Sequence, residues 1–381
     1  MKLLLSFFLF LSSLALTAQT GLYNAGNLQL HEGNMGFHTH LINDGTFDQN
    51  QGLIGFYGNN TLTVSGAFMP VFHDMELFNP AGLLLETAVG VRNTLNFVEG
   101  DVLTPRNLRD IYLNFFTDAI PVNERDVAKI NGYAASTDQS SFVFPVGDEA
   151  QLRPLTMNAE APVALAKSAY FLEDPNNPSA FPISFDTSRK SSGVNLISVT
   201  EFWALEGNVP TTITLRWNPR SNLRSLTDDV TKIGLVGWNY AANSWVDLGN
   251  VGLSGDLANG FVTSESFVPD DYAVITFGSL PLPTDVLTLD NYYLTPNGDG
   301  TNDFLVIPEM ADSPNNSIQI FDRFGLKVFE MENYTNEFNG FPNVANFVVD
   351  EKQGLPAGVY FYLVSLKDLE MDFQGFLYLR R

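Results

Sequence analysis

The chain has 381 residues, with 43 Asp or Glu against 20 Lys or Arg, so its formal net charge is −23. This acidic excess argues against nucleic-acid or anionic-membrane binding, because both need a basic protein surface. The 45% hydrophobic content and the 31 phenylalanines predict buried cores rather than an acidic disordered chain. Cysteine is absent, which excludes disulfides, thiolate catalysis and zinc–thiolate sites.

The first 19 residues have the pattern of a secretory signal peptide. Lys2 precedes an apolar run at 3–16, and the small residues around Ala18 suit cleavage. A membrane anchor is the alternative, but this run is shorter than the ~20 residues that a spanning helix needs. We therefore expect export and a mature chain without a transmembrane segment.

Residues 20–108 consist of short apolar runs between turn signals such as Asn43-Asp44-Gly45. The runs predict short strands at 37–42, 53–57, 62–64, 75–78, 83–86 and 95–98. Short strands with corner turns favour a small irregular β-helix, a solenoid whose rungs bury their inward faces on each other, although no strict period is visible. An ordinary β-sandwich is the alternative.

Residues 109–277 predict a second all-β domain. Strands are expected at 141–146, 197–205, 211–217, 232–238, 244–248, 260–264 and 272–277. Their spacing, with turn residues between them, is typical of a β-sandwich. The four tryptophans are expected to pack in its core, whereas an exposed aromatic platform would indicate sugar binding.

A short Pro-containing segment at 278–284 is expected to be a stiff linker, because Pro281 and Pro283 restrict the backbone. It predicts a domain boundary, after which residues 285–381 form a small C-terminal β-domain. This domain carries nine more acidic than basic residues, so a receptor for it is expected to be basic in places. The alternative is that the charge only keeps the domain soluble.

The C-terminal segment has five ordered sequence blocks. They are the turn at 295–303, a hairpin with its turn at 322–325, Phe338-Asn339-Gly340, the turn at 354–358 with the strand 359–364, and the last strand at 375–381. Glycines at 298, 300, 325 and 358 are expected to set the strand geometry at these turns, the last through a positive φ.

These blocks resemble the gliding motility-associated C-terminal domain, the type B sorting domain of type IX secretion in Bacteroidota. Phe338 stands where that family usually has Trp, and the body at 20–284 is not assigned to a family. The residues that match the family motif are Pro296, Asn297, Asp299, Gly300, Asn302, Asp303, Arg323, Gly325, Phe338, Gly340, Pro356, Gly358, Tyr360 and Arg380.

The resemblance implies an immunoglobulin-like β-sandwich that acts as an export address. It implies Sec export to the periplasm, followed by passage across the outer membrane. The implied partners are the type IX secretion translocon and its outer-membrane accessory protein. The implied location is the outer cell surface or the medium.

Oxygen-bearing side chains are dense in the first of these turns. A calcium site is one interpretation, because hard cations take six to eight oxygen ligands. The loop departs from an EF-hand, and a turn whose side chains bond their own backbone explains the same residues. The candidate ligands are Asn297, Asp299, Thr301, Asn302 and Asp303.

The body shows no catalytic motif. His38 and His40 would share one face of a strand, but zinc needs three or four ligands, and surface histidines are the simpler interpretation. No Gly-x-Ser-x-Gly, His-Glu-x-x-His or phosphate-binding loop occurs. We expect a non-enzymatic, structural or adhesin-like body without a cofactor, with a surface glycan or protein as its ligand. The alternative is a secreted carbohydrate-active or glycan-binding protein.

Overall fold

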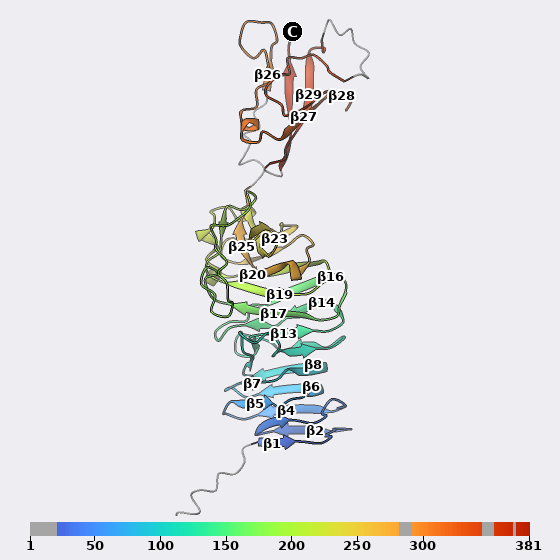
Figure 1. The fold of residues 1–381 in the computed structure, drawn as a ribbon, viewed down its shortest axis with the longest axis vertical. Helices are drawn as coiled ribbons and strands as arrows, with labels where there is room; N and C mark the ends of the chain where they lie inside the picture. The colour runs from blue at the N-terminus through green and yellow to red at the C-terminus, as the bar shows by residue number, and fades with distance from the viewer. Residues whose placement is uncertain (1–20, 282–291, 345–353, 369–370) are drawn as a thin grey trace, which may run out of the picture. The chain divides into compact units, whose positions relative to one another are not determined.

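The computed structural model describes residues 21–281, 292–344, 354–368 and 371–381. The predicted signal peptide and the later part of the predicted linker lie outside the described residues. The chain divides into two compact units, Met1–Ser279, here called the body, and Leu280–Arg381, here called the C-terminal unit. The described residues form β-strands and short 3₁₀ helices without an α-helix, which confirms the all-β prediction (Figure 1).

The first sheet of the body has seven parallel strands, which follow one another in chain order. Its strands are β1 (Gly21–Asn24), β3 (His40–Asn43), β5 (Leu62–Ser65), β7 (Leu83–Leu85), β9 (Val102–Leu103), β12 (Ile130–Asn131) and β15 (Val146–Gly147).

The second sheet of the body has thirteen strands and begins as a parallel stack that alternates with the first sheet along the chain. Its parallel strands are β2 (Asn34–Phe37), β4 (Leu53–Tyr57), β6 (Val71–Phe78), β8 (Val89–Glu99), β10 (Leu113–Phe115) and β13 (Ala134–Ser136), with β11 (Ile120–Val122) paired to β8. The two sheets are the two faces of a β-solenoid (Figure 1).

The solenoid has a repeat that the sequence did not reveal. Side chains of successive rungs meet at separations of 19 to 21 residues. Insertions stretch one separation to 28 residues, between Asp101 and Lys129, and this variation hides the period in the sequence. Phe37, Phe56 and Phe72 stack inside successive rungs, with centroids 5.1 and 6.0 Å apart.

Buried asparagines hold the corners where the chain passes between the two sheets. Asn24 donates to the Asn43 side chain of the next rung at 2.7 Å, and Asn50 donates to the Val71 carbonyl at 2.8 Å. Asn79 donates to the Asn60 carbonyl at 2.8 Å. Corner backbone groups cannot join a strand ladder, so these amides satisfy groups that would otherwise be buried without a partner.

Three predicted strands are broken in the structure. The predicted strand 141–146 is divided at Pro145 between β14 (Gln139–Phe144) and β15, which belong to different sheets. The predicted strand 37–42 is divided between β2 and β3, because the chain bends at His38 and Thr39 to cross from one sheet to the other. The predicted strand 197–205 is divided between β18 (Leu196–Ile197) and β19 (Phe202–Glu206). These segments mix apolar with polar residues, and their composition does not by itself locate the bend.

The second sheet continues past β13 as an antiparallel sheet, without a break in its hydrogen bonding. Its antiparallel strands are β17 (Ala166–Phe171), β18 (Leu196–Ile197), β19 (Phe202–Glu206), β25 (Tyr272–Ser279), β21 (Ile233–Asn239) and β22 (Ser244–Asp247). A third sheet completes the sandwich, with strands β14 (Gln139–Phe144), β16 (Leu155–Val163), β20 (Thr211–Trp217), β24 (Gly260–Thr263) and β23 (Gly252–Gly255).

Solenoid and sandwich form one unit, whereas the sequence predicted two domains divided at residue 108. β8 pairs with β10, and β9 pairs with β12, so both solenoid sheets run across that position. One hydrophobic core extends from Phe37 to Phe277. The predicted linker starts later than 278, because Gly278 and Ser279 end strand β25.

A buried ionic network lies where the solenoid becomes a sandwich. Arg153 donates to Glu201 at 2.6 Å and to Ser221 at 2.8 Å. The Tyr170 hydroxyl donates to the other Glu201 oxygen at 2.6 Å, and burial raises the pKa of Tyr170 above its usual range. Trp203 donates to the Arg153 carbonyl at 2.9 Å. The network therefore ties β17 and β19 to the chain between β15 and β16.

The C-terminal unit contains a single five-stranded sheet within the described residues. Its strands, in spatial order, are β26 (Tyr292–Leu294), β30 (Met371–Leu379), β29 (Gly358–Leu366), β27 (Asn316–Phe321) and β28 (Lys327–Glu332). Within the described residues the second layer consists of turns and η5 (Pro308–Asp312), whereas the sequence predicted an immunoglobulin-like sandwich. Prolines, asparagines and glycines at 295–315 and 333–344 favour turns over strand pairing.

Four further 3₁₀ helices connect strands of the body. They are η1 (Pro219–Ser221), η2 (Leu223–Ser225), η3 (Val230–Lys232) and η4 (Pro269–Asp271).

We predict that Glu201→Gln lowers the free energy of unfolding of the body by about 3 kcal/mol, because Arg153 keeps its buried charge without a counter-ion. The matched control is Glu206→Gln, five residues further along the chain, whose ion pairs with Arg109 and Lys167 are partly exposed. Its effect should stay below about 1 kcal/mol. Denaturant unfolding of the full chain measures both variants, and equal losses would contradict the prediction.

Candidate functional site in the C-terminal unit

The loop at 295–303 is held by its own side chains. Asp303 accepts hydrogen bonds from the backbone N–H groups of Gly298 and Gly300, both at 2.7 Å, and these bonds lower the pKa of Asp303. Asp299 accepts from the Thr301 N–H at 2.8 Å and from the Asn297 side chain at 2.9 Å. The turn interpretation accounts for these bonds, and calcium binding stays a prediction.

Left-handed backbone conformations shape the same loop. Gly298, Gly300 and Asn302 have φ of 80°, 87° and 54°. Glycine, and less often asparagine, adopts this region at low cost. The expectation that the two glycines set the loop geometry is consistent with these angles. Pro296 lies beside Gly340, 3.4 Å from where a Cβ would stand, so the loop contacts the next motif block.

The hairpin between β27 and β28 turns at a second glycine. Gly325 has φ of 81°, and the Asp322 side chain accepts from the N–H groups of Phe324 at 2.8 Å and Leu326 at 2.9 Å. Arg323 extends over the ring of its neighbour Phe324, which is 80% exposed. Arg323 is therefore available on the surface rather than used in the core.

Phe338, which stands where the resemblance would place a tryptophan, lies inside the second layer. It is fully buried and meets Phe329 edge to face, with centroids 4.9 Å apart. Its backbone carbonyl accepts from the Leu305 N–H, while the Tyr334 hydroxyl donates to the Leu305 carbonyl at 2.6 Å. Gly340 has φ of 81°, and its carbonyl accepts from Arg381 at 3.0 Å. This block anchors the turns onto the sheet.

The turn before β29 places Tyr360 in the core. Its hydroxyl donates to the Pro356 carbonyl at 2.8 Å, which fixes the approach to the strand. Gly358 is the first residue of β29 and lacks a positive φ, so the expectation for that position is wrong. The left-handed glycine in this block is Gly354, with φ of 63°. A Cβ on Gly354 would lie 1.8 Å from the Arg381 guanidinium.

The two faces of the C-terminal sheet differ in their surroundings. Tyr360, Tyr362 and Val364 of β29 point into the core with Ile318 and Ile320 of β27. Six residues on the opposite face are apolar and each is 41–49% exposed; we call them the outer apolar patch. They are Tyr293, Val359, Phe361, Leu363, Phe376 and Tyr378.

Sequence reasoning missed this patch because its residues lie between the motif blocks, or at alternate positions within them. The alternation of the strands could have revealed it: both faces of β29 are apolar from Val359 to Leu363. Of the motif residues, Arg380 is beside the patch and donates to the Tyr293 hydroxyl at 3.3 Å.

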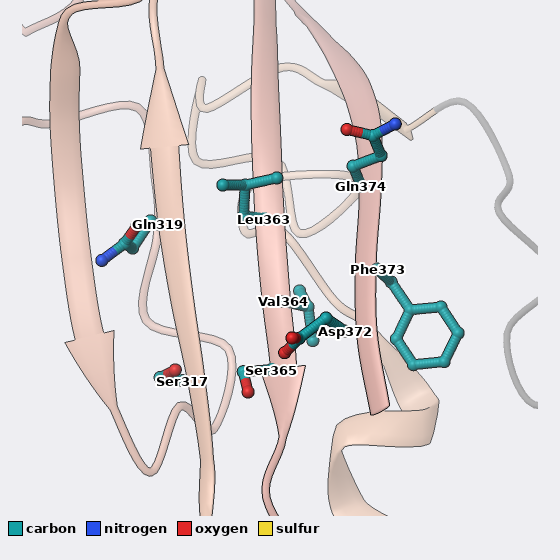
Figure 2. A pocket seen from close by; sticks show the side chains of 8 residues that line it. All are labelled: Ser317, Gln319, Leu363, Val364, Ser365, Asp372, Phe373 and Gln374. Carbon is teal, nitrogen blue, oxygen red and sulfur yellow. The ribbon is translucent and has the colours of Figure 1, made fainter. Parts of the chain in front are cut away.

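A polar hollow borders the patch on the same face (Figure 2). Gln319, Ser365 and Gln374 line it together with Leu363 and Asp372. It is shallow and open, and its lining holds one carboxylate. Nothing in this geometry indicates catalysis.

The histidines of the body are not gathered into a site. His38 follows β2 and His40 begins β3, so they do not share one strand as predicted. His38 packs against the ring of Tyr57 at 5.6 Å. No group of three metal-ligating His, Asp or Glu side chains occurs among the described residues. Over the same residues, no helix is both long and apolar enough to cross a membrane.

We predict that Gly325→Ala destabilises the C-terminal unit by about 1 kcal/mol, because alanine is strained at a positive φ. Gly358→Ala is the matched control, since both positions have open space for an added methyl group and only Gly325 has a positive φ. The control should be neutral or slightly stabilising. Thermal unfolding of the full chain tests this, and equal effects at both positions would contradict it.

Comparison with known proteins assigns the C-terminal unit and leaves the body without a match. No curated protein and no solved structure matches the chain significantly. A family model matches residues 287–379, which lie inside the predicted sorting domain at 285–381 and include every residue of its motif except Arg380. The match implies interaction with the type IX secretion machinery, and export to the cell surface or the extracellular space. Residues 287–379 are thus a type IX secretion signal domain of the CHU_C family.

Proposed function

We propose that the chain is a structural or adhesive protein, whose non-enzymatic body is delivered outside the cell by its C-terminal domain. The observation that carries the proposal for the body is the burial of all four tryptophans, each at most 3% exposed. A carbohydrate-active protein would use exposed aromatic rings beside a carboxylate pair. Here the rings pack in the core, as Trp203 does against Tyr170 and Phe277.

The proposed route begins with Sec export through the predicted signal peptide at 1–19. The C-terminal domain then directs passage from the periplasm across the outer membrane. The two units have separate hydrophobic cores, which supports a sorting domain that acts independently of the body. A unit with its own core can fold without the rest of the chain.

We predict that residues 280–381, placed after a signal peptide and an unrelated soluble cargo, carry the cargo into the medium or onto the cell surface. The chain truncated after residue 279 should stop in the periplasm, because it keeps the signal peptide and loses the sorting domain. Immunoblots of medium, surface and periplasm measure the distribution. Retention of the fusion in cells that export the full chain would show that the body carries part of the signal.

Glycan binding is the second candidate function. It is favoured by three neighbouring side chains on the solenoid, Tyr57, Glu76 and Asn96, which we call the polar row. The Tyr57 ring lies over Gly55 and Gly36. A Cβ atom added to Gly55 would be 2.2 Å from the nearest atom of that ring. Its hydroxyl donates to Glu76 at 3.0 Å, and Asn96 donates to the other Glu76 oxygen at 2.8 Å. An aromatic ring beside amide and carboxylate groups is a set of side chains that can bind a sugar.

We predict that the purified full chain releases no reducing ends from a panel of bacterial, algal and plant polysaccharides. Affinity electrophoresis on the same polysaccharides tests the second candidate. Glycan binding through the polar row should weaken in Glu76→Gln and persist in Ser141→Ala, an exposed control on another sheet. Release of reducing ends would overturn the non-enzymatic proposal.

A further inference from the structure

The outer face of the C-terminal sheet departs from the usual pattern of a sheet with one solvated side. Antiparallel strands that cover a core on one side normally place polar residues on the other. β29 is instead apolar outward at Val359, Phe361 and Leu363, each more than 40% exposed. It lies inside the sheet, between β30 and β27, so this is not an edge effect.

The exposed apolar residues form contiguous rows rather than scattered positions. Phe361 is paired with Phe376, and Val359 with Tyr378, on neighbouring strands. Tyr293 continues the second row and stacks on Tyr378, with centroids 5.7 Å apart and planes at 14°. Large contiguous apolar patches on a protein surface mark interaction sites.

The other end of the same face is polar. Next to Leu363 lie Gln319 and Gln374, followed by Ser365 and Asp372. On the neighbouring edge strand, Glu330 and Glu332 face the same side, where they form ion pairs with Lys327 and Lys367. The face therefore has an apolar end and a polar end, and Figure 2 shows side chains of the hollow at their border, among them Gln319, Ser365 and Asp372.

The sheet does not need the patch for its own core. The opposite face is buried by Leu305, Ile307, Met310, Tyr334 and Phe338 of the second layer. Cross-strand aromatic pairs add only about 0.2–1 kcal/mol each to a sheet. Because the backbone of β29 is paired on both sides, a partner can contact this face only through side chains.

Charge and shape restrict the partner. A flat patch without a deep cavity fits a protein surface rather than a small molecule. Residues 285–381 carry nine more acidic than basic residues, so a second copy and an anionic lipid surface are both repelled. The matched signal domain has one class of protein that must recognise it, the export machinery.

We propose that the outer apolar patch is the surface through which the C-terminal domain docks on a subunit of the type IX secretion machinery. The contact surface of that subunit is apolar, to match the patch. The proposal rests on the proposed function, because it assumes that the C-terminal domain directs export. It adds which face of the domain the machinery contacts.

The test exchanges two central residues of the patch in the full chain, expressed in its exporting host. Phe361→Thr with Phe376→Thr removes both rings and keeps β-compatible, outward-facing side chains. The matched control, Gln319→Thr with Gln374→Thr, changes the same face outside the patch. Exported protein should fall about tenfold in the patch variant, as for loss of an interface hot spot, and stay within about twofold in the control.

Two further measurements distinguish failure of the proposed function from failure of the proposed docking surface. A chain that ends at residue 286 tests the proposed function: if it is exported normally, the C-terminal domain is not the address. If the truncation blocks export while the folded patch variant is exported normally, the docking surface alone is wrong. Thermal unfolding of the purified variants establishes that they are folded.

A photo-crosslinking residue at Val359 tests the contact without removing a ring. In exporting cells it should crosslink to a type IX machinery subunit, identified by mass spectrometry, and the same residue at Gln319 should crosslink much less. A crosslink to a second copy of this chain would overturn the proposal, and so would the absence of any machinery subunit. This arm decides the question even if the double variant does not fold.

Discussion

Continuous hydrogen bonding across the thirteen-stranded sheet is the constraint on which the body depends. A parallel solenoid ends in an open rung, which leaves unpaired backbone groups and an exposed core. In this chain the last parallel strand, β13, pairs with the antiparallel strand β17, so the sandwich closes that end of the solenoid. The boundary expected near residue 108 is absent because a cut there would expose both sheets.

The buried Arg153–Glu201 pair lies at this change from parallel to antiparallel strands. Such a pair costs desolvation energy for both charges, and their attraction offsets that cost only when further hydrogen bonds satisfy the buried groups. Tyr170 and Ser221 bond the two side chains, and Trp203 bonds the backbone carbonyl of Arg153, from three separate segments. Apolar packing tolerates small shifts between sheets, whereas these directional contacts fix which strand follows the last rung.

The C-terminal unit divides its residues between fold and surface along the strand alternation. Tyr360, Tyr362 and Val364 fill its core, while Val359, Phe361 and Leu363 between them face outward. The motif glycines and aspartates close turns, and Phe338 anchors the second layer. Most motif residues therefore build the domain, and the residues best placed for contact with a partner lie between them.

The sequence by itself determined the all-β class, the position of the secretion signal domain and most strands, such as 53–57 and 211–217. These features depend on local composition, turn residues and the order of short motifs, which the chain carries directly. Tertiary structure alone decided the bend at His38, the single body across residue 108, the ordinary φ of Gly358 and the outer apolar patch. Each of these depends on which strand lies beside which, and residues far apart in the chain settle that through pairing and shared burial.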